Sequence, residues 1–220
     1  MNRKPYRHSL ILGSGEDVPE KPLGNCKGSL IIAADGGGAL AKRWGLVPHL
    51  IIGDGDSLSP QIECYWQEKN VPFLRFPTKK DYTDIELAIN YCLDRDIKDI
   101  TIVGGWGSRI DHGLGNIELL YSLALKGIDN RLFTRTHMLS AFEGDLEVDA
   151  RVGEPFSIIP LTTRVEGITT RGLLYPLSDA CLEKGTTMPI SNEAVQRKIK
   201  ICSKKGVLLV ILSNKIPLDI

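Results

Sequence analysis

The sequence has no excess of charge of either sign, because its 220 residues carry 27 lysines and arginines against 27 aspartates and glutamates. Proteins that bind nucleic acids or anionic lipids through phosphate groups usually carry a basic excess or a basic run, and neither is present. Long hydrophobic runs are also missing, since 207–212 falls far short of the roughly 18 residues that a membrane-spanning helix needs. We therefore expect no nucleic-acid partner and no membrane association.

Cysteine is scarce, and the five cysteines are widely spaced and form no CxxC pair. Scattered cysteines in odd number are typical of reduced thiols in a cytoplasmic protein. The basic start is followed by only a short apolar stretch, 10–12, so we expect no secretion signal. A GxxxxGK[ST] phosphate-binding loop is absent too, and any phosphate must therefore be held by another arrangement.

The first two thirds of the chain alternate short apolar runs with segments of helical periodicity, a pattern typical of βαβ units and a mainly parallel sheet. The expected strands are 10–12, 30–34, 50–52, 73–76, 100–103 and 131–134. One expected helix begins at the capping box formed by Thr83 and Glu86, and a second follows Asp111.

After about residue 140 the helical pattern ends. Short apolar or alternating runs take its place at 156–161, 173–177, 195–201 and 207–212, with glycines such as Gly206 as breaks. In 195–201 the isoleucines fall on one strand face, whereas Lys198 and Lys200 fall on the other, which we expect to be the outer face. These runs predict an antiparallel sandwich or a small barrel.

We therefore expect an α/β fold in which 1–140 form a mainly parallel catalytic domain and 141–220 form an antiparallel β-sandwich. The charges differ between the two parts of the chain. Residues 1–150 hold 17 basic and 21 acidic side chains, a net charge of −4, and 151–220 hold 10 and 6, a net charge of +4.

Acidic residues recur directly after the expected strands, where an open α/β sheet has its ligand crevice. Asp35 ends the second strand and is followed by Gly36, Gly37 and Gly38. Such glycines let a backbone approach a phosphate closely at a helix start. A tight strand-to-helix turn without a ligand would use the same residues.

The third expected strand runs into Asp54 and Asp56, two carboxylates one residue apart in a glycine-flanked loop. Like charges this close repel each other unless a cation lies between them. A magnesium ion, which takes one or two carboxylates together with substrate phosphates, would remove the conflict. The alternative is a solvated acidic loop.

The segment that leads into the helix expected at Thr83 combines Lys79 and Lys80 with Asp81 and Asp84. The acids could simply favour a helix start, where the helix dipole stabilises negative charge. Lysines beside them, however, supply charges that bind phosphates. The mixture favours a site for a magnesium-bound nucleotide.

The fifth expected strand leads through Gly104 and Gly105 to Arg109, Asp111 and His112. An arginine can hold phosphate oxygens in a bidentate fork and stabilise the charge that develops during transfer. The histidine could be a proton carrier or a capping or packing residue. Four such motifs at four strand ends indicate phosphate chemistry more strongly than any one of them.

The order and spacing of these four blocks resemble the thiamine pyrophosphokinase family, and the segments 158–161, 172–177 and 190–193 resemble its second domain. The resemblance implies a homodimer with active sites between the catalytic domain of one subunit and the sandwich of the other. It also implies transfer of a pyrophosphoryl group from ATP to the hydroxyl of thiamine, giving thiamine diphosphate and AMP.

The resemblance also assigns roles to particular residues. It implies Asp54, Asp56 and Asp84 as Mg²⁺ ligands, and Asp35, Asp81, Arg109 and Asp111 as catalytic residues. Residues implied to bind nucleotide or substrate are Gly36, Gly37, Lys80, Thr83, Gly105, His112, Ser191 and Asn192. Either Asp81 or Asp111 could accept the hydroxyl proton.

Two positions depart from the family pattern. Gly55 stands where a bulky apolar residue is frequent, and Glu193 follows Asn192 where some members have an aromatic. Tyr82, Trp106 and Tyr175 are therefore the candidates for stacking on the thiamine rings. The competing functions are a magnesium-dependent phosphotransferase or hydrolase with another substrate, and a nucleotide-binding regulatory module without turnover.

Overall fold

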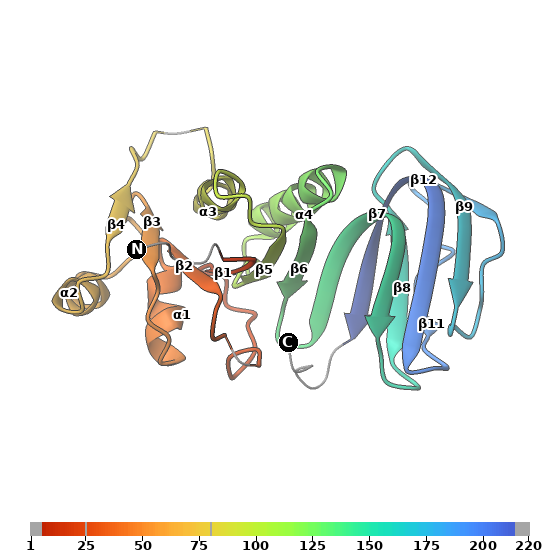
Figure 1. The fold of residues 1–220 in the computed structure, drawn as a ribbon, viewed down its shortest axis with the longest axis horizontal. Coiled ribbons are helices and arrows are strands. Elements are labelled where there is room, and N and C mark those ends of the chain that lie inside the picture. The colour runs from red at the N-terminus through yellow and green to blue at the C-terminus, as the bar shows by residue number, and fades with distance from the viewer. Residues whose placement is uncertain (1–5, 25, 80, 214–220) are drawn as a thin grey trace. The chain divides into compact units, whose positions relative to one another are not determined.

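The computed structural model describes residues 6–24, 26–79 and 81–213 (Figure 1). Within these residues the chain forms two compact units. The first comprises 6–116 with 132–135, and the second comprises 117–131 with 136–213.

The first unit is built on a parallel sheet. Its strands are β1 (His8–Leu12), β2 (Leu30–Ala34), β3 (Leu50–Gly53), β4 (Phe73–Arg75) and β5 (Asp99–Val103), in the spatial order β4-β3-β2-β1-β5. The middle strands are buried along almost their whole length, which explains why they are continuous apolar runs rather than alternating ones. All five strands were predicted, including the edge strand β4, which is mostly exposed.

Four helices connect or follow these strands: α1 (Gly37–Arg43), α2 (Pro60–Glu68), α3 (Asp84–Leu93) and α4 (Ile110–Leu125). The predicted cap is confirmed, because the Thr83 hydroxyl accepts a hydrogen bond from the Glu86 N–H at 3.2 Å. The chain moves outward from β1 to β4 and then returns to the other side of β1 as β5. Since such crossovers are right-handed, α1 and α3 lie on opposite faces of the sheet (Figure 1).

The strands after α4 are β6 (Asp129–Phe133), β7 (His137–Asp149), β8 (Pro155–Pro160), β9 (Arg164–Arg171), β10 (Ala180–Glu183), β11 (Asn192–Glu193) and β12 (Lys198–Ser213). Within the second unit β12 is the central strand, and it pairs antiparallel with β7, β8 and β9. The prediction of parallel strands followed by antiparallel ones is confirmed.

Two predictions about the second unit are wrong in detail. Gly206 does not separate two strands but lies in an irregularity of the single strand β12, with a φ of +96°. The run 173–177 is not a strand, and its regular pairing is limited to a bridge between Leu173 and Ala194. Gly172 turns the chain before this run and Pro176 lacks a donor for a ladder, so the apolar composition misleads there.

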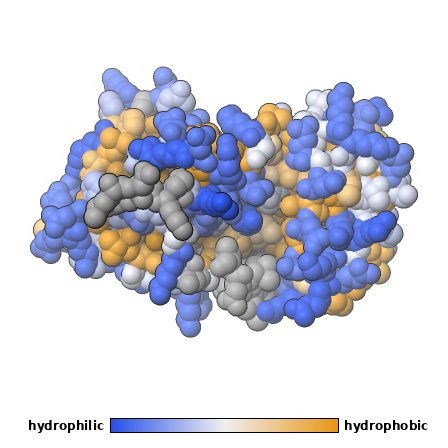
Figure 2. Space-filling view, viewed as in Figure 1, coloured by the Kyte–Doolittle hydropathy of each residue, from blue (hydrophilic) through white to orange (hydrophobic). Residues whose placement is uncertain are grey.

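No helix in the described part of the chain is both long and apolar enough to span a bilayer. Hydrophilic side chains cover much of the face seen in Figure 2, with apolar residues between them. All five cysteines are free thiols.

Candidate active site

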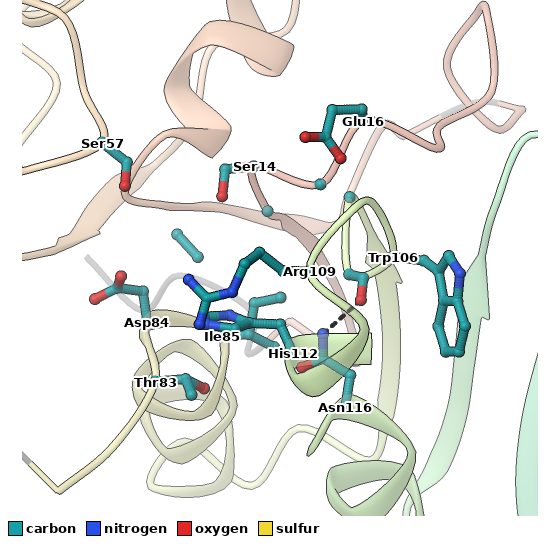
Figure 3. A pocket seen from close by; sticks show the side chains of 15 residues that line it. Ser14, Glu16, Ser57, Thr83, Asp84, Ile85, Trp106, Arg109, His112 and Asn116 are labelled. Atoms are coloured by element: carbon teal, nitrogen blue, oxygen red, sulfur yellow. Dashed lines mark hydrogen bonds between the residues drawn. The ribbon is translucent and has the colours of Figure 1, made fainter. Parts of the chain in front are cut away.

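A pocket of about 290 Å³ opens at the carboxyl ends of the parallel strands (Figure 3). It is lined by Gly13, Ser14, Gly15, Glu16, Ala34, Ser57, Thr83, Asp84, Ile85, Gly104, Gly105, Trp106, Arg109, His112 and Asn116. The loops after β1 and β5 both contribute, and between these two strands the order of the sheet reverses. Open α/β sheets bind ligands at this switch point.

Three carboxylates meet beside the pocket. Asp35, Asp54 and Asp84 each offer an oxygen, and these oxygens lie within 4.8 Å of one another. Asp35 is only 2% exposed; one of its oxygens accepts a hydrogen bond from the Ser57 N–H at 2.9 Å. Its other oxygen, Oδ1, is buried without a hydrogen-bond partner among the described residues. Such a donor set fits a hard divalent cation.

The same environment raises the pKa of Asp35. Burial is the main cause, and the carboxylates of Asp84, Asp56 and Asp54 add to it, while the hydrogen bond from the Ser57 N–H acts in the opposite direction. A cation among these carboxylates would remove both the repulsion and the unsatisfied oxygen.

The structure places the other predicted acidic residues differently. Asp56 is exposed, accepts a hydrogen bond from the Ser57 hydroxyl at 2.9 Å and lies outside the three-carboxylate group. Asp81 is also exposed, in the loop before α3. Lys80 lies outside the described residues. Thr83 caps α3 and thereby places Asp84 in the first helical turn, at the pocket wall.

Arg109 reaches across the pocket from the loop after β5 (Figure 3). Its Nε and Nη2 donate to the two carboxylate oxygens of Asp111 at 2.9 and 2.6 Å. This pairing holds the pKa of Asp111 well below its usual range and raises that of Arg109. Both side chains are exposed, so phosphate oxygens can compete for the guanidinium.

The glycine loop before Arg109 is fixed from inside the unit. The Asn116 amide donates to the Gly105 carbonyl at 2.6 Å, and Asn116 is buried. Gly104 has a φ of +72°, which favours glycine. His112 lines the pocket with an exposed side chain. Sequence reasoning missed Asn116, although its position one turn after His112 on the same helix was available.

The glycines after Asp35 have a packing role as well. Gly36 precedes α1, and Gly37 begins it so close to β1 that a side chain would collide with the Leu12 carbonyl. Gly38 lies against Trp66, whose indole N–H donates to the Gly38 carbonyl at 3.0 Å. The glycine run therefore lets α1 pack directly on the strand and on α2.

Ser191 and Asn192, the residues assigned to thiamine, lie in the second unit beside β8. Ser191 is exposed with a φ of +61°. The Asn192 side chain is buried and binds the backbone of Tyr175, accepting from its N–H at 3.0 Å and donating to its carbonyl at 2.8 Å. Asn192 thus holds Tyr175 in place, and the Tyr175 side chain is 67% exposed.

A parallel sheet that carries a pocket with an arginine at its switch point, and a three-carboxylate group beside that pocket, fits the class of α/β enzymes that act on phosphate groups. The sequence matches two family models: "Thiamin pyrophosphokinase, catalytic domain" over residues 25–132 and "Thiamin pyrophosphokinase, vitamin B1 binding domain" over 145–208. The chain belongs to the thiamine pyrophosphokinase family, a family of ATP-dependent diphosphotransferases.

Individual relatives agree with this membership. The chain is 34% identical to thiamine pyrophosphokinase of Bacillus subtilis over 190 residues, which cover 84% of this chain and 88% of the relative. It is 26% identical to thiamin pyrophosphokinase 1 of Caenorhabditis elegans, over 82% of this chain and 77% of that protein. The crystal structure of the Bacillus subtilis enzyme superposes with a TM-score of 0.84 at 27% identity and covers 95% of this chain and 100% of that one.

Proposed function

We propose that this chain transfers the pyrophosphoryl group of ATP to the hydroxyethyl oxygen of thiamine, giving thiamine diphosphate and AMP. The observation that carries the proposal is the switch-point pocket, in which Asp84 and Arg109 lie in a chain matched by both family models. The pocket provides groups for a polyphosphate: carboxylates suited to a divalent cation, and a guanidinium.

The proposed cofactor is Mg²⁺, held by Asp35, Asp54 and Asp84. Support comes from the short separation of their oxygens and from the unsatisfied Oδ1 of Asp35. When bound, the ion neutralises phosphate charge and orients the phosphate oxygens. Asp56, which the resemblance assigns as a ligand, is exposed two residues from Asp54, where it could bind through water.

We propose that Arg109 binds the transferring phosphates and stabilises the charge that develops as AMP leaves. Its pairing with Asp111 uses Nε and Nη2, so Nη1 lies outside that pair. A lowered pKa makes Asp111 a weak proton acceptor, and its proposed role is to orient Arg109. This leaves Asp81 as the better candidate for the group that accepts the thiamine hydroxyl proton.

In the proposed reaction the thiamine hydroxyl oxygen attacks the β-phosphorus of ATP. The bond between that phosphorus and the α,β-bridging oxygen breaks, and AMP carries the bridging oxygen away. Attack at β rather than γ requires the α- and β-phosphates to be held in place. This is the proposed task of Arg109 and of the three-carboxylate group, which would act on the phosphates through the divalent cation that it would hold. Positioning and charge stabilisation supply most of the acceleration in such transfers.

The proposed thiamine site uses the second unit. Asn192 holds Tyr175 by two hydrogen bonds, and the exposed ring of Tyr175 offers a stacking surface for an aromatic cation. Ser191 supplies a hydroxyl beside it. We further propose a homodimer in which this surface faces the pocket of the partner subunit.

We also keep residues 1–140 and 141–220 as the proposed catalytic and thiamine-binding domains, because the two family models match on either side of that boundary. A cytoplasmic location is proposed from the five free thiols, which fit a reducing compartment.

The decisive experiment is incubation of the purified protein with ATP, MgCl₂ and thiamine, followed by mass detection of products. Thiamine diphosphate and AMP in equal amounts support the proposal. Formation of ADP or free phosphate would indicate a phosphotransferase or hydrolase instead, and ATP binding without products would indicate a regulatory module. Arg109→Ala is expected to remove most product formation without changing the far-ultraviolet circular dichroism spectrum.

A further inference from the structure

The loops after β1 and β5 are joined to each other along the pocket. The Gly13 N–H donates to the Val103 carbonyl at 2.7 Å, and the Gly15 N–H donates to the Gly104 carbonyl at 2.8 Å. Glycine is required in both loops, because a side chain at Gly13 or Gly15 would collide with the backbone of the loop after β5, and one at Gly104 would collide with the backbone of the loop after β1. The two loops therefore form one rigid wall at the switch point.

Glu16 extends this connection with a side chain. One carboxylate oxygen accepts a hydrogen bond from the Ser108 N–H at 2.9 Å, and the other accepts one from the Ser108 hydroxyl at 3.0 Å. These hydrogen bonds lower the pKa of Glu16, so the carboxylate is ionised at neutral pH. A side chain at Gly107 would displace this carboxylate, so glycine there leaves room for its hydrogen bonds to Ser108.

The bonded residue, Ser108, directly precedes Arg109, and α4 begins one residue later at Ile110. The Glu16 carboxylate therefore fixes the backbone from which the Arg109 side chain starts. We propose that Glu16 is a positioning residue that holds Arg109 where its guanidinium can contact the transferring phosphates. This inference rests on the proposed function, because it takes Arg109 to be a phosphate-binding group.

A direct role for Glu16 in substrate binding fits the contacts less well. Both of its oxygens already accept hydrogen bonds from Ser108. An ionised carboxylate on the wall of a phosphate pocket would also repel the substrate. A carboxylate at position 16 is explained instead by the loop that it holds, because a small displacement of a catalytic group lowers the reaction rate strongly.

The test is a double-mutant cycle with Glu16→Ala and Arg109→Ala, assayed by AMP release at varied ATP. If Glu16 acts through Arg109, Glu16→Ala lowers kcat/KM for ATP about tenfold in the wild-type background and less than about twofold in the Arg109→Ala background. Equal losses in both backgrounds, or no loss in the first, would overturn the proposal.

Glu16→Gln separates geometry from charge. Its amide oxygen can accept from the Ser108 N–H and its amide nitrogen can donate to the Ser108 hydroxyl, so we expect kcat/KM within about threefold of wild type. A loss as large as that of Glu16→Ala would overturn the proposal, because the charge itself would then be required. Glu20→Ala, an exposed position on the same loop, is the matched control and is expected to leave the kinetics unchanged.

Acrylamide quenching of tryptophan fluorescence reports on the loop without relying on activity. Trp106 lies in the loop after β5 that Glu16 holds. It is the most accessible of the three tryptophans, because Trp44 and Trp66 are only 9% and 2% exposed. We expect Glu16→Ala to raise the quenching constant by about half or more, and Glu20→Ala to leave it unchanged. Unchanged quenching in Glu16→Ala would overturn the holding role. A wild-type protein that makes no thiamine diphosphate would refute the proposed function instead, and quenching would still decide whether Glu16 holds the loop.

Discussion

Replacement of Asp35 by asparagine tests whether the three-carboxylate group is arranged for a cation. Asp35 is 2% exposed, and one of its oxygens accepts the Ser57 N–H. Asparagine has nearly the same volume and keeps an oxygen for that hydrogen bond, so the loop after β3 should remain in place. The substitution then removes one negative charge from the group and little else.

The separation of the carboxylates sets the size of the effect. At 4.8 Å, the outer limit between any two of the three oxygens, two unit charges repel by about 3 kcal/mol at an effective dielectric constant of 20. Solvent in the pocket and side-chain relaxation reduce this, so we expect Asp35→Asn to raise the free energy of unfolding in EDTA by about 1 kcal/mol. That corresponds to a Tm increase of about 2–4 °C for a chain of this size.

In the presence of Mg²⁺ the stability difference between the variant and the wild type should reverse, because Asp35→Asn removes one ligand of the ion. We expect Mg²⁺ to bind at least about tenfold more weakly, a loss of about 1.4 kcal/mol in binding free energy. The Mg²⁺-dependent rise in Tm, followed by circular dichroism over a series of MgCl₂ concentrations, should shrink accordingly. The matched control is Asp96→Asn, at an exposed site whose φ of +56° asparagine also adopts. A variant that melts earlier in EDTA and keeps the full Mg²⁺ response would refute the reasoning.

Three further predictions concern stability. Thr83→Ala removes the cap of α3 and should lower the free energy of unfolding by about 1 kcal/mol, measured by urea denaturation, whereas Thr83→Ser should retain most of it. Glu147 accepts hydrogen bonds from two lysines of β12, which lower its pKa from 4.5 to about 2. The stabilising contribution of Glu147 is therefore complete above pH 4.5 and is lost as the pH falls through 2. Between pH 5 and 2 the Glu147→Gln variant should therefore lose less free energy of unfolding than the wild type. Equal losses in the two proteins would contradict this prediction. Gly206→Val should destabilise by about 2 kcal/mol or more, because its φ is +96° and a Cβ would lie 2.6 Å from the Thr162 hydroxyl; an unchanged urea midpoint would refute this.

The parallel half of the fold was predictable because each strand is a short run followed by a turn, and four of the five runs are buried while the edge strand β4 is mostly exposed. The capping box marked the start of α3 correctly, since the interaction of Thr83 with Glu86 is local in sequence. The start of α2 carried a similar signal, a serine cap at Ser59 followed by Pro60, which sequence reasoning did not use.

What sequence reasoning missed depends on contacts between distant residues. Glu16 and Ser108 are 92 positions apart, and nothing local to either residue indicates their pairing. The resemblance implied a catalytic role for Asp35, yet its burial beside Asp54 and Asp84 follows from the order of β2 and β3 in the sheet and the position of α3. Gly206 resembled a break because a glycine in a bulge and a glycine in a turn have the same sequence signature.

The position of β12 has a consequence for how the chain folds during synthesis. The five parallel strands are complete by Val103, so their sheet can form early. By contrast β7, β8 and β9 pair with β12, which begins only at Lys198. Until that strand emerges from the ribosome, these three strands expose unpaired backbone and apolar faces, the condition under which nascent chains aggregate. A chain interrupted before β12 should therefore depend on chaperones far more than one interrupted before β7.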